Sequence, residues 1–188
     1  VNAPFYRIPP PRTAASWVAR VADRPDFEFT VKLHQSLTHQ RSLDPHVVRA
    51  MLDFVRPLRE AGRLGPLLAQ FPWSFRCSGL AMDWVRRLAD DFGEYPLAVE
   101  VRHTSWDRPD AREKLRDMRV NYCNIDQPVL HQCLPPTGYV TGPIGYVEAV
   151  RTTEEDEPHS LIVRVGSLFS VLVAVPVEAV EGLDPATE

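Results

Sequence analysis

Charged side chains stand late in strand-like segments of this sequence, at positions where they could do chemistry. In the segment LAVEVRHTSWD (97–107), apolar residues alternate with Glu100 and Arg102. Alternation at period two predicts a strand with two different faces, so Glu100 and Arg102 lie side by side opposite the valines. The pair could be an internal ion pair that fixes a pocket. Alternatively, Arg102 could hold an anionic or hydroxylated ligand while Glu100 acts as acid, base or ligand anchor.

Lys32 and His39 are the other two candidates for catalysis. The segment FEFTVKLH (27–34) alternates in the same way and puts Lys32, one of two lysines in the chain, on the polar face. An interior lysine without a partner is costly, so we expect Lys32 to pair with Glu100 or Asp126, or to meet a ligand phosphate or carboxylate. His39 follows the same strand on a loop, where it either serves the site or braces the loop.

Five more residues are candidates for ligand binding because of comparable positions. Asn2 and Tyr6 belong to the segment 1–6, which we expect to be extended. Gln70 lies late in the strand-like segment 65–72, and Asp126 ends the segment 120–126. Trp106 is either a lid or packing aromatic, or a platform for stacking a base. The residues expected to converge on one concave site are Asn2, Tyr6, Lys32, Gln70, Glu100, Arg102 and Asp126.

Helical segments separate these strands, so the fold class is predicted to be α/β. A strand–helix repeat of roughly 30 residues predicts parallel strands joined by right-handed crossovers, either in an open doubly wound sheet or in a (β/α) barrel. An open sheet would be apolar on both faces. A barrel gathers polar groups inside, near the C-terminal strand ends, so the polar faces favour a TIM-type barrel. The predicted helices cover 12–23, 44–62, 79–93 and 108–119, and Pro57 is expected to kink or divide the second.

Composition is typical of a globular protein of one domain, with 188 residues and 44% hydrophobic side chains. The most apolar segment, 168–180, is shorter than the ~20 residues that a membrane-spanning helix needs, and Pro176 interrupts it, so no membrane association is expected. The three cysteines form no CxxC pair, which predicts reduced thiols and a cytoplasmic location.

Charge and motifs narrow the function classes. The net charge of −4 does not favour nucleic acid as a partner, and it is unevenly spread: residues 148–188 carry nine acidic and two basic side chains. His39, Glu100, His103 and Asp126 are metal-ligand types without a metal-ligand spacing. No glycine-rich phosphate loop or GxSxG element is found. The sequence therefore predicts no cofactor and no metal.

Five ordered segments, VNAPFYRIP, FTVKLHQSLTHQRSL, LGPLLAQFPWSF, VEVRHTSW and IDQP, resemble successive motifs of the YecE-like family, domain of unknown function 72. The resemblance covers residues 1 to about 147. It implies a TIM-type barrel in which residues 1–6 match the second strand, so that the first strand is missing here. After GPIGY the chain departs from the family pattern. We expect residues 148–188 to form a divergent acidic tail, with a β-hairpin across Gly166-Ser167.

These observations lead to hypotheses of different classes. The first is an enzyme that acts on a small polar or phosphorylated substrate by acid–base or hydrolytic chemistry, using Lys32, Glu100, Arg102 and His39. The alternative is a nucleic-acid-binding or repair-associated barrel, with Arg7, Arg12, Arg41 and Arg102 near its mouth and Trp106 stacking on a base. A third is a truncated product without activity.

Overall fold

The protein folds around one sheet of seven strands in the order β1-β2-β3-β4-β5-β6-β7. The computed structural model describes residues 1–126, 131–149, 160–164 and 171–172. Strands β1 to β5 run parallel, and β6 and β7 are antiparallel additions. The strands are β1 (Phe29–Lys32), β2 (Leu64–Gln70), β3 (Leu97–Glu100), β4 (Asn121–Asp126), β5 (Ile144–Ala149), β6 (Ser160–Arg164) and β7 (Val171–Leu172).

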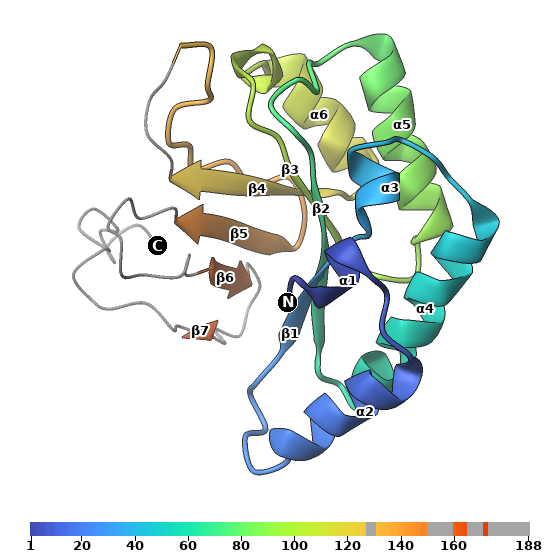
Figure 1. The fold of residues 1–188 in the computed structure, drawn as a ribbon. Coiled ribbons are helices and arrows are strands. Elements are labelled where there is room, and N and C mark those ends of the chain that lie inside the picture. The colour runs from blue at the N-terminus through green and yellow to red at the C-terminus, as the bar shows by residue number, and fades with distance from the viewer. Residues whose placement is uncertain (127–130, 150–159, 165–170, 173–188) are drawn as a thin grey trace.

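The helices lie against one side of this sheet, which curves around the other side (Figure 1). The arrangement is an α/β half-barrel of five parallel strands, which confirms the predicted class and strand direction. In the strand order, β1 and β7 lie at opposite ends, so the described strands do not close on themselves. The helices are α1 (Ala3–Tyr6), α2 (Pro11–Arg20), α3 (Gln35–Thr38), α4 (Pro45–Glu60), α5 (Gly79–Asp91) and α6 (Pro109–Asp117), with a 3-10 turn, η1 (Thr104–Trp106).

The segment 1–6 was expected to be extended, and this prediction is wrong for most of it. Residues 3–6 form helix α1, which begins with a proline near its first position, where the fixed φ of proline suits a helix. Val1 alone pairs with β1: its amino-terminal nitrogen donates to Thr30 O, and its carbonyl accepts from Lys32 N at 3.1 Å. These two bonds are those of one parallel bridge, at the edge of β1.

Helix α4 follows its predicted signals at both ends. The Asp44 carboxylate accepts a hydrogen bond from His46 N at 2.8 Å, and Gly62 adopts the left-handed conformation, with φ +64°, just after the helix. Pro57 lies inside α4 without dividing it. A continuous apolar stripe at helical spacing buries the helix on both sides of the proline and stabilises it there. This stripe consists of Met51, Phe54, Val55 and Leu58.

Alternation along the strands creates two apolar layers. On the helix side, Val31, Leu67 and Val99 belong to the main core. On the concave side, a smaller cluster forms the floor beneath the polar strand ends. This floor consists of Leu68, Ala98, Cys123 and Tyr146, each at most 1% exposed.

A loop before β5 is fixed to β4 by the buried side chain of Asn124. The amide nitrogen donates to Tyr139 O at 2.9 Å and Tyr146 O at 3.1 Å. The amide oxygen accepts from Thr137 Oγ1 and Tyr139 N, both at 2.8 Å. All four hydrogen-bonding positions of one side chain are therefore used to hold the loop and β5 on the sheet.

The last three strands lie in or next to the segment 148–188, which was predicted to be a divergent acidic tail. Strand β5 runs across the expected boundary between residues 147 and 148. Strands β6 and β7 pair antiparallel, with Ile162 opposite Leu172, as the predicted hairpin requires. The connection across Gly166-Ser167 lies outside the described residues. The division into a domain at 1–147 and a tail at 148–188 stays a prediction.

Candidate functional site

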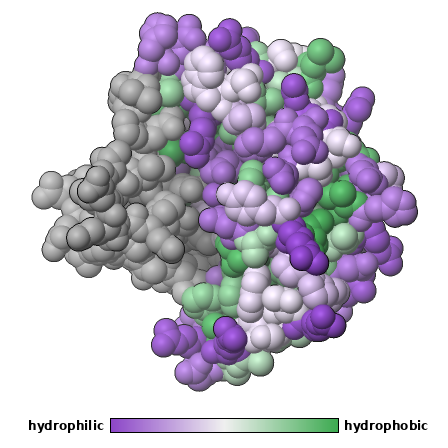
Figure 2. Space-filling model, in the orientation of Figure 1, coloured by the Kyte–Doolittle hydropathy of each residue, from purple (hydrophilic) through white to green (hydrophobic). Residues whose placement is uncertain are grey.

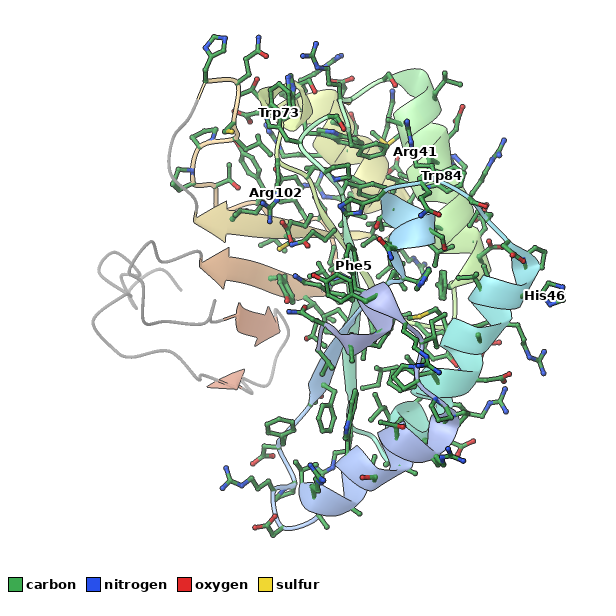
Figure 3. All side chains as sticks on the ribbon, in the orientation of Figure 1. Phe5, Arg41, His46, Trp73, Trp84 and Arg102 are labelled. Carbon is green, nitrogen blue, oxygen red and sulfur yellow. The ribbon has the colours of Figure 1, made fainter. Side chains whose placement is uncertain are left out.

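Parallel register brings polar groups from three strands to one end of the concave face. Gln70 on β2 is the direct register partner of Glu100 on β3, and Lys32 ends β1 opposite Leu68. Because side chains alternate between faces, Lys32, Gln70 and Glu100 lie on the same side as the apolar floor. Arg102 follows two residues after Glu100 and lies on the side of the sheet away from α4 (Figure 3).

Lys32, Gln70, Glu100 and Arg102 form one hydrogen-bonded group, here named the four-residue network. Lys32 Nζ donates to Gln70 Oε1 at 3.2 Å, and Gln70 Nε2 donates to Glu100 Oε2 at 2.6 Å. Arg102 approaches Glu100 Oε1 through Nε at 2.9 Å and through its terminal nitrogen at 2.7 Å. The Glu100 side chain is 0% exposed, whereas that of Arg102 is 35% exposed.

The network refines the expected pairing of Lys32. Lys32 reaches Glu100 through the Gln70 amide rather than directly. The side chain of its other expected partner, Asp126, lies outside the described residues, so that pairing stays a prediction. Both oxygens of Glu100 already accept hydrogen bonds from the network. These bonds orient Gln70 and Arg102, and the predicted catalytic role of Glu100 stays a prediction.

His39 lies close to the network, just after α3. Its Nδ1 is 3.0 Å from Thr38 Oγ1, and its ring meets the Phe5 ring edge-on at 5.1 Å between centroids. Partial desolvation of the ring and the positive charge of Arg102 lower the pKa of His39 below its ordinary value. His39 is therefore a mostly neutral imidazole at neutral pH, within the electrostatic reach of Arg102.

Helix α1 places the two N-terminal candidates differently. Tyr6 is 71% exposed, and its ring packs edge-on against Phe5 at 4.9 Å, so it joins the cluster around His39. Asn2 is exposed at the start of α1, and its side chain makes no capping hydrogen bond there. Of the seven residues expected to converge, the structure thus joins the four of the network and brings Tyr6 near His39 through Phe5.

Trp106 is a correction to the predicted ligand-binding set. Its side chain is 0% exposed, stacks on Phe75 and donates from Nε1 to Phe75 O at 2.7 Å. A fully buried indole packs in the core and offers no face to a base or a sugar. Of the two alternatives for Trp106, packing is the correct one.

Two residues near the strand ends are absent from the predicted site, His34 and Trp73, although the alternation of 27–34 predicts that His34 shares the polar face with Lys32. His34 follows Lys32 by two residues and caps α3, with its Nδ1 accepting from Ser36 N at 3.2 Å. Trp73 follows β2, is 40% exposed and has the guanidinium of Arg76 5.6 Å from its ring centre. The sequence holds a further signal for His34, because the pattern His-x-Ser occurs within three residues of the ends of both β1 and β3, at 34–36 and 103–105.

The outer surface carries a groove that none of the predicted site residues lines. It has a volume of about 760 Å³, and three arginines and four acidic residues surround it between α4 and the end of α5. Hydrophilic side chains dominate the face of the molecule seen in Figure 2, with apolar residues in small groups among them. The groove has nearly balanced charge and lies apart from the network.

Within the described residues, no three His, Cys, Asp or Glu side chains gather as a metal-binding group. The helices in the same ranges are too short or too polar for any of them to cross a membrane.

The family model described as "Protein of unknown function DUF72" matches residues 1–164. This chain belongs to the DUF72 family. The match extends beyond residue 147, so the family likeness includes the end of β5 and all of β6, which the predicted resemblance left outside it. The family model therefore continues past the point after GPIGY where we expected the chain to depart from it.

Relatives of known sequence or structure support the same assignment. The UPF0759 protein YunF of Bacillus subtilis is 31% identical over 115 residues, which are 58% of this chain and 40% of that protein. A DUF72 protein of Thermotoga maritima is 35% identical with a TM-score of 0.63, over 74% of this chain and 54% of that one. A DUF72 protein of Enterococcus faecalis shares the fold, at 24% identity and a TM-score of 0.69, over 76% of this chain and 61% of that one. The chain spans less than two thirds of the length of these relatives.

Proposed function

We propose that this chain carries the substrate-binding part of a TIM-type (β/α) barrel enzyme that acts on a small polar or phosphorylated substrate. The observation that supports this proposal is the four-residue network, in which a buried carboxylate holds a partly exposed guanidinium and is connected through Gln70 to an ammonium group. Within the four-residue network, two cations and one anion give a net positive charge. An anionic group of a ligand would be attracted there.

The proposed roles follow from the geometry. Lys32 and Arg102 bind the anionic group of the substrate, and Glu100 and Gln70 hold these two cations in position. His39 is the acid–base residue of a hydrolytic or proton-transfer reaction, because its lowered pKa keeps a ring nitrogen available as a base at neutral pH. Asn2, Tyr6 and Asp126 stay proposed ligand contacts. None of the three cysteines forms a disulfide, which supports a reducing compartment such as the cytoplasm.

Isothermal titration calorimetry of the full chain with inorganic phosphate tests the anion site. We expect Lys32→Gln to weaken phosphate binding at least about tenfold, because a hydrogen bond to a charged group contributes about 1.5–3 kcal/mol. The double variant Glu100→Gln/Arg102→Gln removes the second cation without leaving a buried charge behind. Arg86→Gln, on the exposed face of α5, is the matched control and should bind like the parent. Unchanged phosphate binding in both network variants would refute the anion site.

A nucleic-acid-binding barrel is the second candidate, and the observation that favours it is Trp73. Its ring is 40% exposed and lies beneath Arg76, so it could stack on a base in place of the buried Trp106. Fluorescence anisotropy with a labelled single-stranded oligonucleotide is the test. Binding that weakens with salt and is lost in Trp73→Ala would favour this candidate over the small-molecule enzyme.

A further inference from the structure

The orientation of the His34 ring fixes which of its nitrogens carries the proton. Its Nδ1 accepts a hydrogen bond from the backbone N–H of Ser36 at 3.2 Å and lies 2.8 Å from Ser36 Oγ. A backbone N–H can only donate, so Nδ1 must present its lone pair. The neutral ring of His34 therefore carries its proton on Nε2 and presents that nitrogen as a donor.

His34 lies on the concave side of β1, in the same row as the polar ends of β2 and β3. Val31 and Leu33 are buried in the helix-side core, at 0% and 1% exposure, so Lys32 and His34 face the other way. The ladder continues past Lys32, because Leu33 N donates to Leu68 O at 2.9 Å. Since Lys32 is opposite Leu68, His34 comes level with Gln70, the partner of Glu100.

The donor on His34 has no acceptor among the described residues. His34 is half-buried, and its Nε2 makes no hydrogen bond within the part of the chain that the structure describes. A partly desolvated donor beside an anion site contributes most when a ligand supplies an acceptor oxygen.

We propose that His34 is a specificity-determining residue, whose Nε2–H donates to an uncharged oxygen of a ligand bound through its anionic group at Lys32 and Arg102. The inference rests on the proposed anion site and names its ligand class, the phosphate monoester of a hydroxylated compound. A neutral donor cannot replace the cations in binding phosphate. It distinguishes a phosphate ester that carries a hydroxyl or carbonyl oxygen from phosphate alone.

His103 provides a comparison within the same fold. Its Nδ1 accepts from Ser105 N at 3.0 Å, so it has the same capping geometry after β3. However, His103 lies on the opposite side of the strand from Arg102, is 6% exposed, and packs against Trp73 at 5.1 Å between ring centres. His103 Nε2 is also buried without a hydrogen-bond partner among the described residues, so only the location differs: His34 has the motif on the face of the network, and His103 does not.

Two substitutions separate the cap from the donor. His34→Asn keeps an acceptor where Nδ1 stands, and Asn is a favoured N-cap residue, but it removes the distal donor. His34→Gln places an amide N–H near the position of Nε2 and gives up the cap. His103→Asn is the matched control, because it makes the same change in the same motif outside the network.

Calorimetry of the full chain with inorganic phosphate and with glycerol 3-phosphate reads out the difference. We expect the parent to bind glycerol 3-phosphate more tightly than inorganic phosphate. His34→Asn should bind glycerol 3-phosphate about fivefold more weakly than the parent and bind inorganic phosphate with unchanged affinity. His34→Gln should retain part of the preference, and His103→Asn should retain all of it.

The outcomes distinguish this inference from the anion site on which it rests. Unchanged glycerol 3-phosphate affinity in a folded His34→Asn overturns the role of His34 and leaves the anion site standing. A parent chain that binds neither compound overturns both. Nitrogen NMR of the ligand-free protein adds a separate check, since a proton found on Nδ1 of neutral His34 overturns the inference even if phosphate binds.

Discussion

Glu100 and Arg102 form an ion pair whose two members differ in access to water. The Glu100 side chain is 0% exposed and Arg102 is 35% exposed. When Glu100 is removed, the guanidinium can turn toward water. When Arg102 is removed, the carboxylate has no such route, and an uncompensated buried charge is strongly destabilising.

We therefore expect Arg102→Ala to lower the free energy of unfolding by about 3–5 kcal/mol, and Glu100→Gln to lower it by much less. Urea denaturation measures both values. The double variant Glu100→Gln/Arg102→Ala is the control and should recover most of the loss. Equal losses in the two single variants would mean that water reaches Glu100 in solution.

His39 should make stability depend on pH. Its folded-state pKa lies below the ordinary value of 6.5, so the folded protein binds fewer protons than the unfolded chain between these two pKa values. The contribution of His39 is fully present above pH 6.5 and is lost as the pH falls through the folded-state pKa. Part of the shift comes from Arg102, so added salt should raise the pKa by screening that charge.

NMR titration of the His39 ring checks this sign, with the urea-unfolded chain as the reference. We expect the folded midpoint to be lower than the unfolded one, and the gap to narrow with salt. A folded midpoint at or above the unfolded one would contradict both the desolvation of the ring and its proximity to Arg102.

The candidate site shows which residues a sequence can and cannot reveal. Alternation at period two was enough to put Lys32, Gln70 and Glu100 on one face. In adjacent parallel strands, residues at paired positions point to the same face and lie close together. Trp106 was misjudged because its exposure depends on Phe75, which is distant in sequence and stacks on it. No local pattern encodes a contact of that kind.

At the scale of elements, Asn121 joins three neighbouring strands. Its amide nitrogen donates to Leu97 O and its amide oxygen accepts from Ile144 N, both at 2.9 Å, and the residue is 0% exposed. A Cβ at Gly142 would collide with this amide oxygen, which cannot move without breaking the bond to Ile144. The close approach explains why glycine stands at this position.

We expect Gly142→Ala to lower the free energy of unfolding by about 2–4 kcal/mol, because displacing Asn121 leaves buried backbone groups unpaired. Gly138→Ala, in the same loop, is the control, since nothing lies within 4 Å of a Cβ there. Thermal and urea unfolding of the two variants give the comparison. If both variants were equally stable, Asn121 could not be the fixed connection between the strands.

Helix boundaries could be predicted where side chains close the helix locally, as Asp44 and Gly62 do for α4. The failure at residues 3–6 has a different cause. Six residues that begin Val-Asn-Ala-Pro offer no clear period, and the pairing of Val1 with β1 depends on a strand that lies 29 residues further along the chain. A local sequence pattern cannot predict short elements whose stability comes from contacts with distant residues.

The whole molecule combines a parallel half-barrel with an antiparallel end. Five parallel strands were predictable from the alternation of strands and helices. That strand–helix pattern did not predict that β6 would return antiparallel beside β5, since the periodicity of a strand does not encode the direction of its neighbour. The direction of the strands after β5 therefore depends on which strand each one pairs with in the folded protein.

Strand β6 determines whether β5 is an edge, so a substitution in its middle tests the whole sheet. Ile162 pairs with Tyr146 of β5 and with Leu172 of β7, so its backbone lies between two strands. Proline cannot donate to a strand ladder, and an unpaired sheet edge promotes self-association. We expect Ile162→Pro to speed hydrogen exchange in residues 144–149 and to shift the protein to larger species on size-exclusion chromatography.

Ser160→Pro is the control, because the first residue of a strand tolerates proline. An Ile162→Pro chain that stays monodisperse, with unchanged exchange in β5, would show that β6 does not cover this edge in solution.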